Sequence, residues 1–187
     1  MALGCQRRHE AAPAEPAAQP GMSDFAAATA ALSADCEGGG FLQARLRGAI
    51  EADLDWHDAA MHCEGGPRPD GRGVRVALGG PLPSDAMLRL RFIFGIADRD
   101  VASGSALALP TNVTVIVEGD GRMFATRGDG RCAVELLQRE PLPGSPRRER
   151  VHARGYCLDP AASLNSDERL HVPTFEFSGV VDAGEQP

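Results

Sequence analysis

The sequence predicts an all-β protein, a single antiparallel β-sandwich or barrel-like domain of about nine strands. Apolar and polar residues alternate with period 2 over Leu42–Trp56 and over Leu88–Ile96, which is typical of strands with one buried face. Clusters of turn-forming residues separate these and other apolar runs at short spacing, whereas at most one short helix is expected. A chain of 187 residues with no visible internal repeat is expected to form one core.

Three regions are expected along the chain. Residues 1–21 contain the Ala/Pro-rich tract Ala11–Gly21, which predicts a disordered tether. Residues 22–40 contain a predicted short helix over Ser23–Ala34 and then a Gly-rich linker. Residues 41–183 carry the alternating runs and form the predicted β-sandwich domain.

The first predicted strand runs from Leu42 to Trp56, with apolar side chains at even positions and mostly charged ones at odd positions. A helix is the alternative, because Leu or Ile also recurs every fourth residue as far as Leu54. A helical stripe would bury Asp53 without a partner, however. The alternation therefore predicts one long strand, with a bulge or bend at Gly48 that lets it follow a curved sheet.

The remaining predicted strands are Ala59–Cys63, Val74–Leu78, Leu88–Ile96, Asn112–Val117, Arg122–Thr126, Cys132–Gln138, Arg150–Leu158 and Leu170–Asp182. Glu118–Gly121 is a strong hairpin signal between two of them. The last strand carries Phe175 and Phe177 on one face. We therefore expect it beside the long first strand, at the centre of one sheet.

Two of these strands flank Glu140–Arg148, a segment that contains three prolines and is expected to be irregular. Opposed residues of an antiparallel hairpin are equidistant from the centre of its loop. Cys132 and Cys157 meet this condition for a centre between Gly144 and Ser145. They are therefore expected to face each other closely enough to form a disulfide.

The start of the chain, Ala2-Leu3-Gly4-Cys5, resembles the end of a bacterial lipoprotein signal, in which small or apolar residues precede a cysteine that becomes lipidated. Leu is usual three positions before that cysteine, where this chain has Ala2. The resemblance implies a lipid on Cys5, a tether after it, and a location on the periplasmic side of a bacterial membrane. It also implies a start of translation upstream of Met1, because such signals carry charged and apolar segments.

If Cys5 is lipidated, four cysteines remain for disulfides. Pairing Cys132 with Cys157 leaves Cys36 with Cys63 by elimination, and two disulfides predict an oxidising compartment. The alternative is a cytoplasmic protein with five reduced thiols. The sequence contains no C-x-x-C and no Cys/His pairs at finger spacing, so no zinc site is expected.

The charge of the chain argues against nucleic acid as a partner. The net charge is −7, every basic residue is Arg, and the pI is near 5.2. Binding to a phosphate backbone depends on clustered cations, and one Trp and one Tyr leave little aromatic surface for base stacking. No stretch approaches the roughly 18 apolar residues of a membrane-spanning helix.

Acidic residues of the first predicted strand form a candidate calcium site. Glu51, Asp53 and Asp55 share one face of that strand, and Asp58 follows at its end. Ca²⁺ takes carboxylate oxygens of this kind. The alternative is a solvated strand face, since no Gly-centred calcium loop accompanies them. No other cofactor is expected.

Two further candidate sites involve aromatic and imidazole groups. Trp56 and His57 would bind a sugar ring or a partner if Trp56 were exposed, whereas its even position favours a core anchor. A hydrolase would need a site assembled from distant segments, for which His57, His152 and Asp98 are the candidates. The sequence contains no G-x-S-x-G, and a P-loop is excluded because there is no Lys.

These observations favour a membrane-anchored envelope lipoprotein whose β-sandwich has a binding or structural role rather than a catalytic one. An envelope protein or a glycan is the candidate partner. A module that binds Ca²⁺ or carbohydrate, and a hydrolase with a loop-assembled site, are the alternatives.

Overall fold

The computed structural model describes Met1, residues 36–98 and residues 108–183. The strands are β1 (Phe41–Gly48), β2 (Ala52–His57), β3 (His62–Pro67), β4 (Gly73–Leu82), β5 (Asp85–Ala97), β6 (Leu109–Glu118), β7 (Met123–Ala125), β8 (Cys132–Leu142), β9 (Ser145–Cys157), β10 (Ala161–Ser163), β11 (Arg169–His171) and β12 (Phe175–Asp182). Single 3-10 turns, η2 (Asp58–Ala60) and η4 (Asp129–Arg131), lie between strands. The predicted tether, the helix over Ser23–Ala34 and Cys5 lie outside the described residues. Among the described residues, no helix has the length and apolar character needed to cross a membrane.

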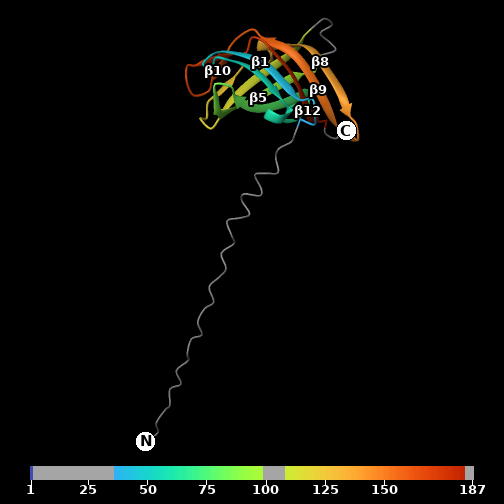
Figure 1. Ribbon diagram of the computed structural model, residues 1–187, viewed down its shortest axis with the longest axis horizontal. Coiled ribbons are helices and arrows are strands. Elements are labelled where there is room, and N and C mark those ends of the chain that lie inside the picture. The colour runs from blue at the N-terminus through green and yellow to red at the C-terminus, as the bar shows by residue number, and fades with distance from the viewer. Residues whose placement is uncertain (2–35, 99–107, 184–187) are drawn as a thin grey trace. The chain divides into compact units, whose positions relative to one another are not determined.

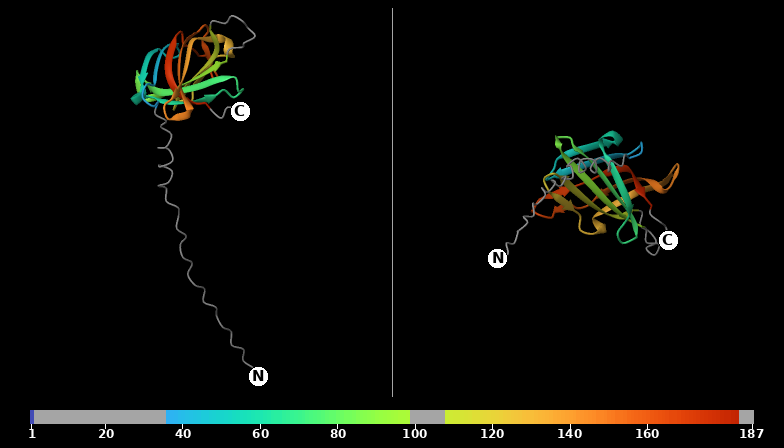
Figure 2. Two further views of the ribbon diagram at one scale, coloured as in Figure 1. Left: turned by 90° about the vertical axis from the view of Figure 1, so that its right-hand side faces the viewer. Right: turned by 90° about the horizontal axis from the view of Figure 1, so that it is seen from below.

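The strands pair antiparallel and form two layers (Figures 1 and 2). One layer has the order β3–β4–β5–β6, and the other has the order β2–β1–β12–β9–β8. The short strands β7, β10 and β11 connect the layers, and so does a pairing between β6 and β8. This arrangement confirms the predicted all-β, sandwich-like fold.

Phenylalanines fill the space between the layers. Phe92 and Phe94 project from β5, and Phe175 and Phe177 project from β12. The ring centroids of Phe94 and Phe177 are 4.4 Å apart, in a stacked arrangement. β12 pairs with β1, which confirms that the first and last predicted strands are neighbours. The period-2 runs therefore supply the core, as their alternation indicates.

The predicted long strand is a hairpin, so the prediction of one continuous strand is wrong. β1 pairs with β2, Leu42 faces Trp56, and the chain reverses between Gly48 and Glu51. Paired positions in this hairpin are both even or both odd, so the fold-back leaves the apolar side chains at even positions on the core face. Gly48 has φ +104°, and a Cβ there would lie 2.6 Å from the carbonyl oxygen of Arg169. Gly48 thus makes the turn rather than a bulge.

The Cys132–Cys157 disulfide forms as predicted, with the two residues paired across β8 and β9. The segment between them is more regular than expected, because β8 continues to Leu142 and β9 begins at Ser145. The turn is therefore centred one residue earlier than predicted. The β8–β9 ladder has two irregularities, one after Val134 and one after Pro141. The first leaves Glu135 without a partner on β9. Together they shift the register so that the two cysteines still face each other.

The second disulfide, Cys36–Cys63, also forms as predicted. It joins the segment before β1 to β3, and so connects the two layers. Gly40 accommodates it, because a Cβ at that position would lie 2.1 Å from the Cβ of Cys36. Two disulfides are typical of proteins that fold in an oxidising, non-cytoplasmic compartment.

The described residues form twelve strands, three more than the sequence indicates. One arises because the Leu42–Trp56 segment folds back on itself. Another is β10, which lies between the predicted strands Arg150–Leu158 and Leu170–Asp182. The third arises because Leu170–Asp182 divides into β11 and β12 on either side of Pro173, which has no N–H to donate to a ladder.

Candidate functional site

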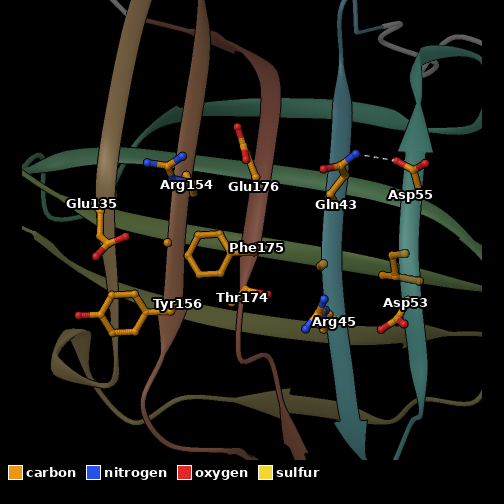
Figure 3. A pocket seen from close by; sticks show the side chains of 13 residues that line it. Gln43, Arg45, Asp53, Asp55, Glu135, Arg154, Tyr156, Thr174, Phe175 and Glu176 are labelled. Carbon is orange, nitrogen blue, oxygen red and sulfur yellow. Dashed lines mark hydrogen bonds between the residues drawn. The ribbon is translucent and has the colours of Figure 1, made fainter.

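A groove of about 460 Å³ lies on the solvent-facing side of the β2–β1–β12–β9–β8 layer. This volume is in the range of small-molecule sites, roughly 300 to 1,000 Å³. Its lining residues are Gln43, Ala44, Arg45, Asp53, Leu54, Asp55, Glu135, Arg154, Gly155, Tyr156, Thr174, Phe175 and Glu176. Figure 3 shows their side chains on the five strands, with strands of the other layer crossing behind.

Strand alternation explains why the groove is polar. On β1 and β2 the even residues face the core, so Gln43, Arg45, Asp53 and Asp55 point outward. On β9, Arg154 points outward for the same reason. A polar surface therefore covers an apolar core along the same strands.

Phe175 and Gly155 shape the floor of the groove. Phe175 is paired with Gly155 across β12 and β9. A Cβ at Gly155 would lie 2.7 Å from Cζ of Phe175 and 2.2 Å from the carbonyl oxygen of Ala133. The missing side chain therefore lets the phenylalanine ring and the neighbouring backbone approach β9 closely.

A β-bulge adds an acidic group to the groove. Val134 pairs with Gly155 and Leu136 pairs with Arg154, so Glu135 is the extra residue on β8. Glu135 is exposed and lines the groove beside Tyr156 (Figure 3). Bulges of this kind redirect a side chain without changing the strand order.

Two arginines in the groove face carboxylates that bind other residues. Arg45 is opposite Asp53, but Asp53 Oδ1 accepts a hydrogen bond from Arg47 Nη2 at 2.9 Å. Arg154 is likewise opposite Glu176 across β9 and β12. Glu176 binds His152 instead, with its Oε1 2.9 Å from His152 Nε2.

Four side chains that line the groove are available to bind a ligand. Within the described residues, Arg45, Glu135, Arg154 and Tyr156 have no hydrogen-bond or ion-pair partner. They offer guanidinium donors, carboxylate acceptors, a phenol hydroxyl and an aromatic ring. This combination suits a ligand with several hydroxyl groups rather than a simple ion.

The carboxylates on the β2 side of the groove are already engaged. Asp55 Oδ1 accepts a hydrogen bond from Gln43 Nε2 at 3.2 Å and lies 3.3 Å from His57 Nε2. With Asp53 held by Arg47, this side forms a fixed polar rim. The groove has four carboxylates and two guanidiniums in all, so its lining carries both signs of charge.

The structure separates the four carboxylates predicted to bind Ca²⁺. Glu51 lies in the β1–β2 turn and accepts a hydrogen bond from the Gly48 amide at 2.7 Å. Asp58 instead accepts hydrogen bonds from backbone amides of the segment before β1, at 2.7 Å in the case of Gly40. Among the described residues, no three His, Cys, Asp or Glu side chains are grouped to hold a metal ion. Calcium binding stays an untested prediction.

Trp56 is a core residue, and His57 is exposed beside it. Trp56 is 3% exposed, its Nε1 donates to the Pro81 carbonyl oxygen at 2.9 Å, and its ring packs edge-on against Phe92. A Cβ at Gly80 would lie 2.4 Å from the indole. The core alternative for Trp56, which its even position favours, is the one the structure shows.

The three candidate hydrolase residues lie apart. His57 and His152 are in one row across the outer face, with Phe41 and Ser178 between them. Three strand spacings separate the two histidines by roughly 14 Å. Asp98 follows the end of β5, in the other layer.

Sequence reasoning missed the β8 and β9 side of the groove. The alternation of Val151 and Ala153 with Arg154 and Tyr156 was the available signal, because it places the two polar residues on the face opposite the core. Glu135 had the same signal, because Cys132 and Val134 face the core and the next residue therefore faces outward. The bulge that leaves Glu135 without a partner on β9 does not follow from the alternation.

Fold and groove together define an antiparallel β-sandwich-like protein with a polar surface groove. A scan against protein-family models, a search of curated proteins and a search of solved structures each found no match to the chain.

Proposed function

We propose that this chain is a bacterial envelope protein, held at a membrane by a lipid on Cys5. Its β-sandwich binds a glycan in the groove on the β2–β1–β12–β9–β8 layer, which we call the glycan groove. The observation that carries the proposal is a set of four polar side chains that line one concave surface and have no partner within residues 36–98 and 108–183. The two disulfides support an oxidising compartment, which the envelope provides.

The chemistry of the groove favours a glycan. Sugar hydroxyls both donate and accept hydrogen bonds, so they match the guanidiniums of Arg45 and Arg154 and the carboxylate of Glu135. The Tyr156 ring supplies an apolar surface for the C–H face of a sugar ring, and its hydroxyl supplies a polar end. An apolar ligand would leave these charged groups desolvated without partners.

Binding is tested with the full chain carrying Cys5→Ser, produced in an oxidising compartment. Calorimetric titration against neutral, amino and carboxylated oligosaccharides should find at least one that binds. Arg154→Ala and Tyr156→Ala should each weaken its binding by about tenfold, the loss expected for a hydrogen bond to a charged group or for an aromatic contact.

The matched control is Arg147→Ala. Arg147 is an exposed arginine of the same strand, and it does not line the groove. Its removal should leave affinity unchanged. The proposal fails if no oligosaccharide binds at millimolar concentration, or if all three variants bind as the parent chain does.

Anchoring is tested by the intact mass of the protein, expressed from its native upstream region and taken from the membrane fraction. The expected mass is that of a diacyl or triacyl chain beginning at Cys5, rising by about four protons on reduction. Cys5→Ser should move the protein to the soluble fraction. An unmodified chain that retains Met1 and fractionates with the cytosol would contradict the anchor.

A further inference from the structure

A second concave surface, of about 310 Å³, lies where the short strands connect the two layers. It is lined by Ala125, Arg127, Arg131, Asp159, Pro160, Ala162 and Arg169. None of these residues lines the glycan groove. We call this surface the arginine pocket.

The arginine pocket carries uncompensated positive charge. Arg131 Nη1 forms an ion pair with Asp159 Oδ2 at 2.5 Å. The side chains of Arg127 and Arg169 have no hydrogen-bond or ion-pair partner in the described part of the chain. Three guanidiniums therefore face one carboxylate, on a chain whose net charge is −7. Like charges gathered in a concavity repel one another and attract an anion.

Backbone contacts hold the pocket together before any ligand arrives. Arg131 directly precedes the Cys132–Cys157 disulfide, and its carbonyl oxygen accepts a hydrogen bond from the Leu158 amide at 2.8 Å. Arg169 pairs with Ala162 in the β10–β11 ladder. The backbone that carries these arginines is therefore already ordered, so binding loses conformational entropy mainly in the side chains.

The pocket has room for a tetrahedral anion. Ala125 and Ala162, which pair across β7 and β10, have small side chains that leave space between the guanidiniums. Each guanidinium is a planar fork that matches two oxygens of a phosphate or sulfate group. A carboxylate presents two oxygens in one plane, whereas a phosphate or sulfate group presents three or four in different directions and so suits guanidiniums that approach from different sides.

We propose that the arginine pocket binds a phosphate or sulfate group, with Arg127 and Arg169 as its principal donors and Arg131 held in place by Asp159. The group can belong to a soluble ester or to a lipid headgroup, since both present the same oxygens. The site is independent of the glycan groove and of the lipid on Cys5.

The test uses the full chain carrying Cys5→Ser at low ionic strength, followed by two-dimensional NMR of its backbone amides. The probes are inorganic phosphate, inorganic sulfate, a monosaccharide phosphate, and vesicles of phosphatidylcholine with or without phosphatidylglycerol. Saturable shifts should appear at Arg127, Arg131 and Arg169 with a phosphate or sulfate probe. Binding to anionic vesicles alone would identify the lipid as the source, provided that the arginine changes abolish it.

Arg127→Ala combined with Arg169→Ala should weaken binding by at least about tenfold and should reduce its dependence on salt. Arg72→Ala is the control, because Arg72 is an exposed arginine of the β3–β4 turn and lies outside the pocket. The single change Arg127→Lys keeps the charge but loses the fork, and should weaken binding by less than the double change. Absence of saturable binding with every probe, or equal binding by the double variant, would overturn the proposal.

Discussion

Arg45 and Asp53 face each other across the β1–β2 ladder, yet Asp53 pairs with Arg47 instead. Arg47 is held at the turn by several acceptors, because its Nη1 also donates to the Leu46 carbonyl oxygen at 2.7 Å and its Nε lies 3.8 Å from Glu51 Oε2. The competition between two arginines for one carboxylate leaves Arg45 free to face the groove.

Removal of Arg47 should therefore weaken glycan binding, although Arg47 does not line the groove. In Arg47→Ala, Asp53 is released and can pair with Arg45, which withdraws a donor from the ligand. We expect affinity to fall several-fold, and Asp53→Asn in the same chain to restore most of it. Calorimetry on the single and double variants measures this, and an unchanged affinity in Arg47→Ala would contradict it.

Each disulfide should make a large contribution to the free energy of unfolding. The bridges join residues separated by 27 and 25 positions, for which chain entropy gives about 3.5 kcal/mol each. Urea unfolding of Cys36→Ser with Cys63→Ser, and of Cys132→Ser with Cys157→Ser, should show losses of that order. As a control, the unfolding free energy of a chain lacking all four of these cysteines should not change when a reductant is added. A loss of unfolding free energy below about 1 kcal/mol in either double variant would argue against a large contribution from that disulfide.

Gly48→Ala should destabilise the protein more than Gly144→Ala does. Both glycines have positive φ, but only at Gly48 would a Cβ meet backbone, at 2.6 Å from the Arg169 carbonyl oxygen. Strain alone should cost about 1 kcal/mol at each site, and the steric contact should add to it at Gly48. Thermal unfolding of the two variants gives the comparison, and equal losses would mean that the β1–β2 turn relaxes without strain.

Trp56→Phe should lower stability without affecting glycan binding. The change removes the donor to the Pro81 carbonyl oxygen and part of the packing against Phe92, which should cost about 1 to 3 kcal/mol. Chemical denaturation measures the first effect and calorimetry the second. A loss of affinity with intact stability would show that Trp56 acts in ligand binding.

Stability should fall in acid as two aspartates are protonated. A hydrogen bond from the Arg72 amide, with the charge of Arg68, lowers the pKa of Asp70 below its ordinary value of 3.8. Burial raises the pKa of Asp120, but hydrogen bonds from Arg122 outweigh this and the net direction is also down. These carboxylates stabilise the fold above pH 3.8, and the contribution disappears as the pH falls through their folded values.

The acid dependence is measured by unfolding between pH 2 and pH 5, and the two pKa values by NMR. Asp70→Asn should flatten part of the stability curve below pH 3.8. Identical curves for the parent and the variant would show that Asp70 has the same pKa in the folded and unfolded chain.

The sequence carries the fold class and the Cys132–Cys157 disulfide because strand alternation and hairpin symmetry are local properties. The Cys36–Cys63 pairing follows only by elimination, once Cys5 is set aside. It does not distinguish one strand from the β1–β2 hairpin, because pairing of even with even positions leaves Leu42 and Trp56 on the same face in either case. Nor does it show the arginine pocket, since Arg127 and Arg169 meet only through the pairings of β7, β10 and β11.

The central claim is that the groove binds a glycan, and the most direct measurement is an NMR titration of the ¹⁵N-labelled chain with the oligosaccharide panel. The account predicts saturable shifts confined to the groove, centred on Arg45, Glu135, Arg154 and Tyr156. Shifts elsewhere on the sandwich, or none with any oligosaccharide at millimolar concentration, would contradict it.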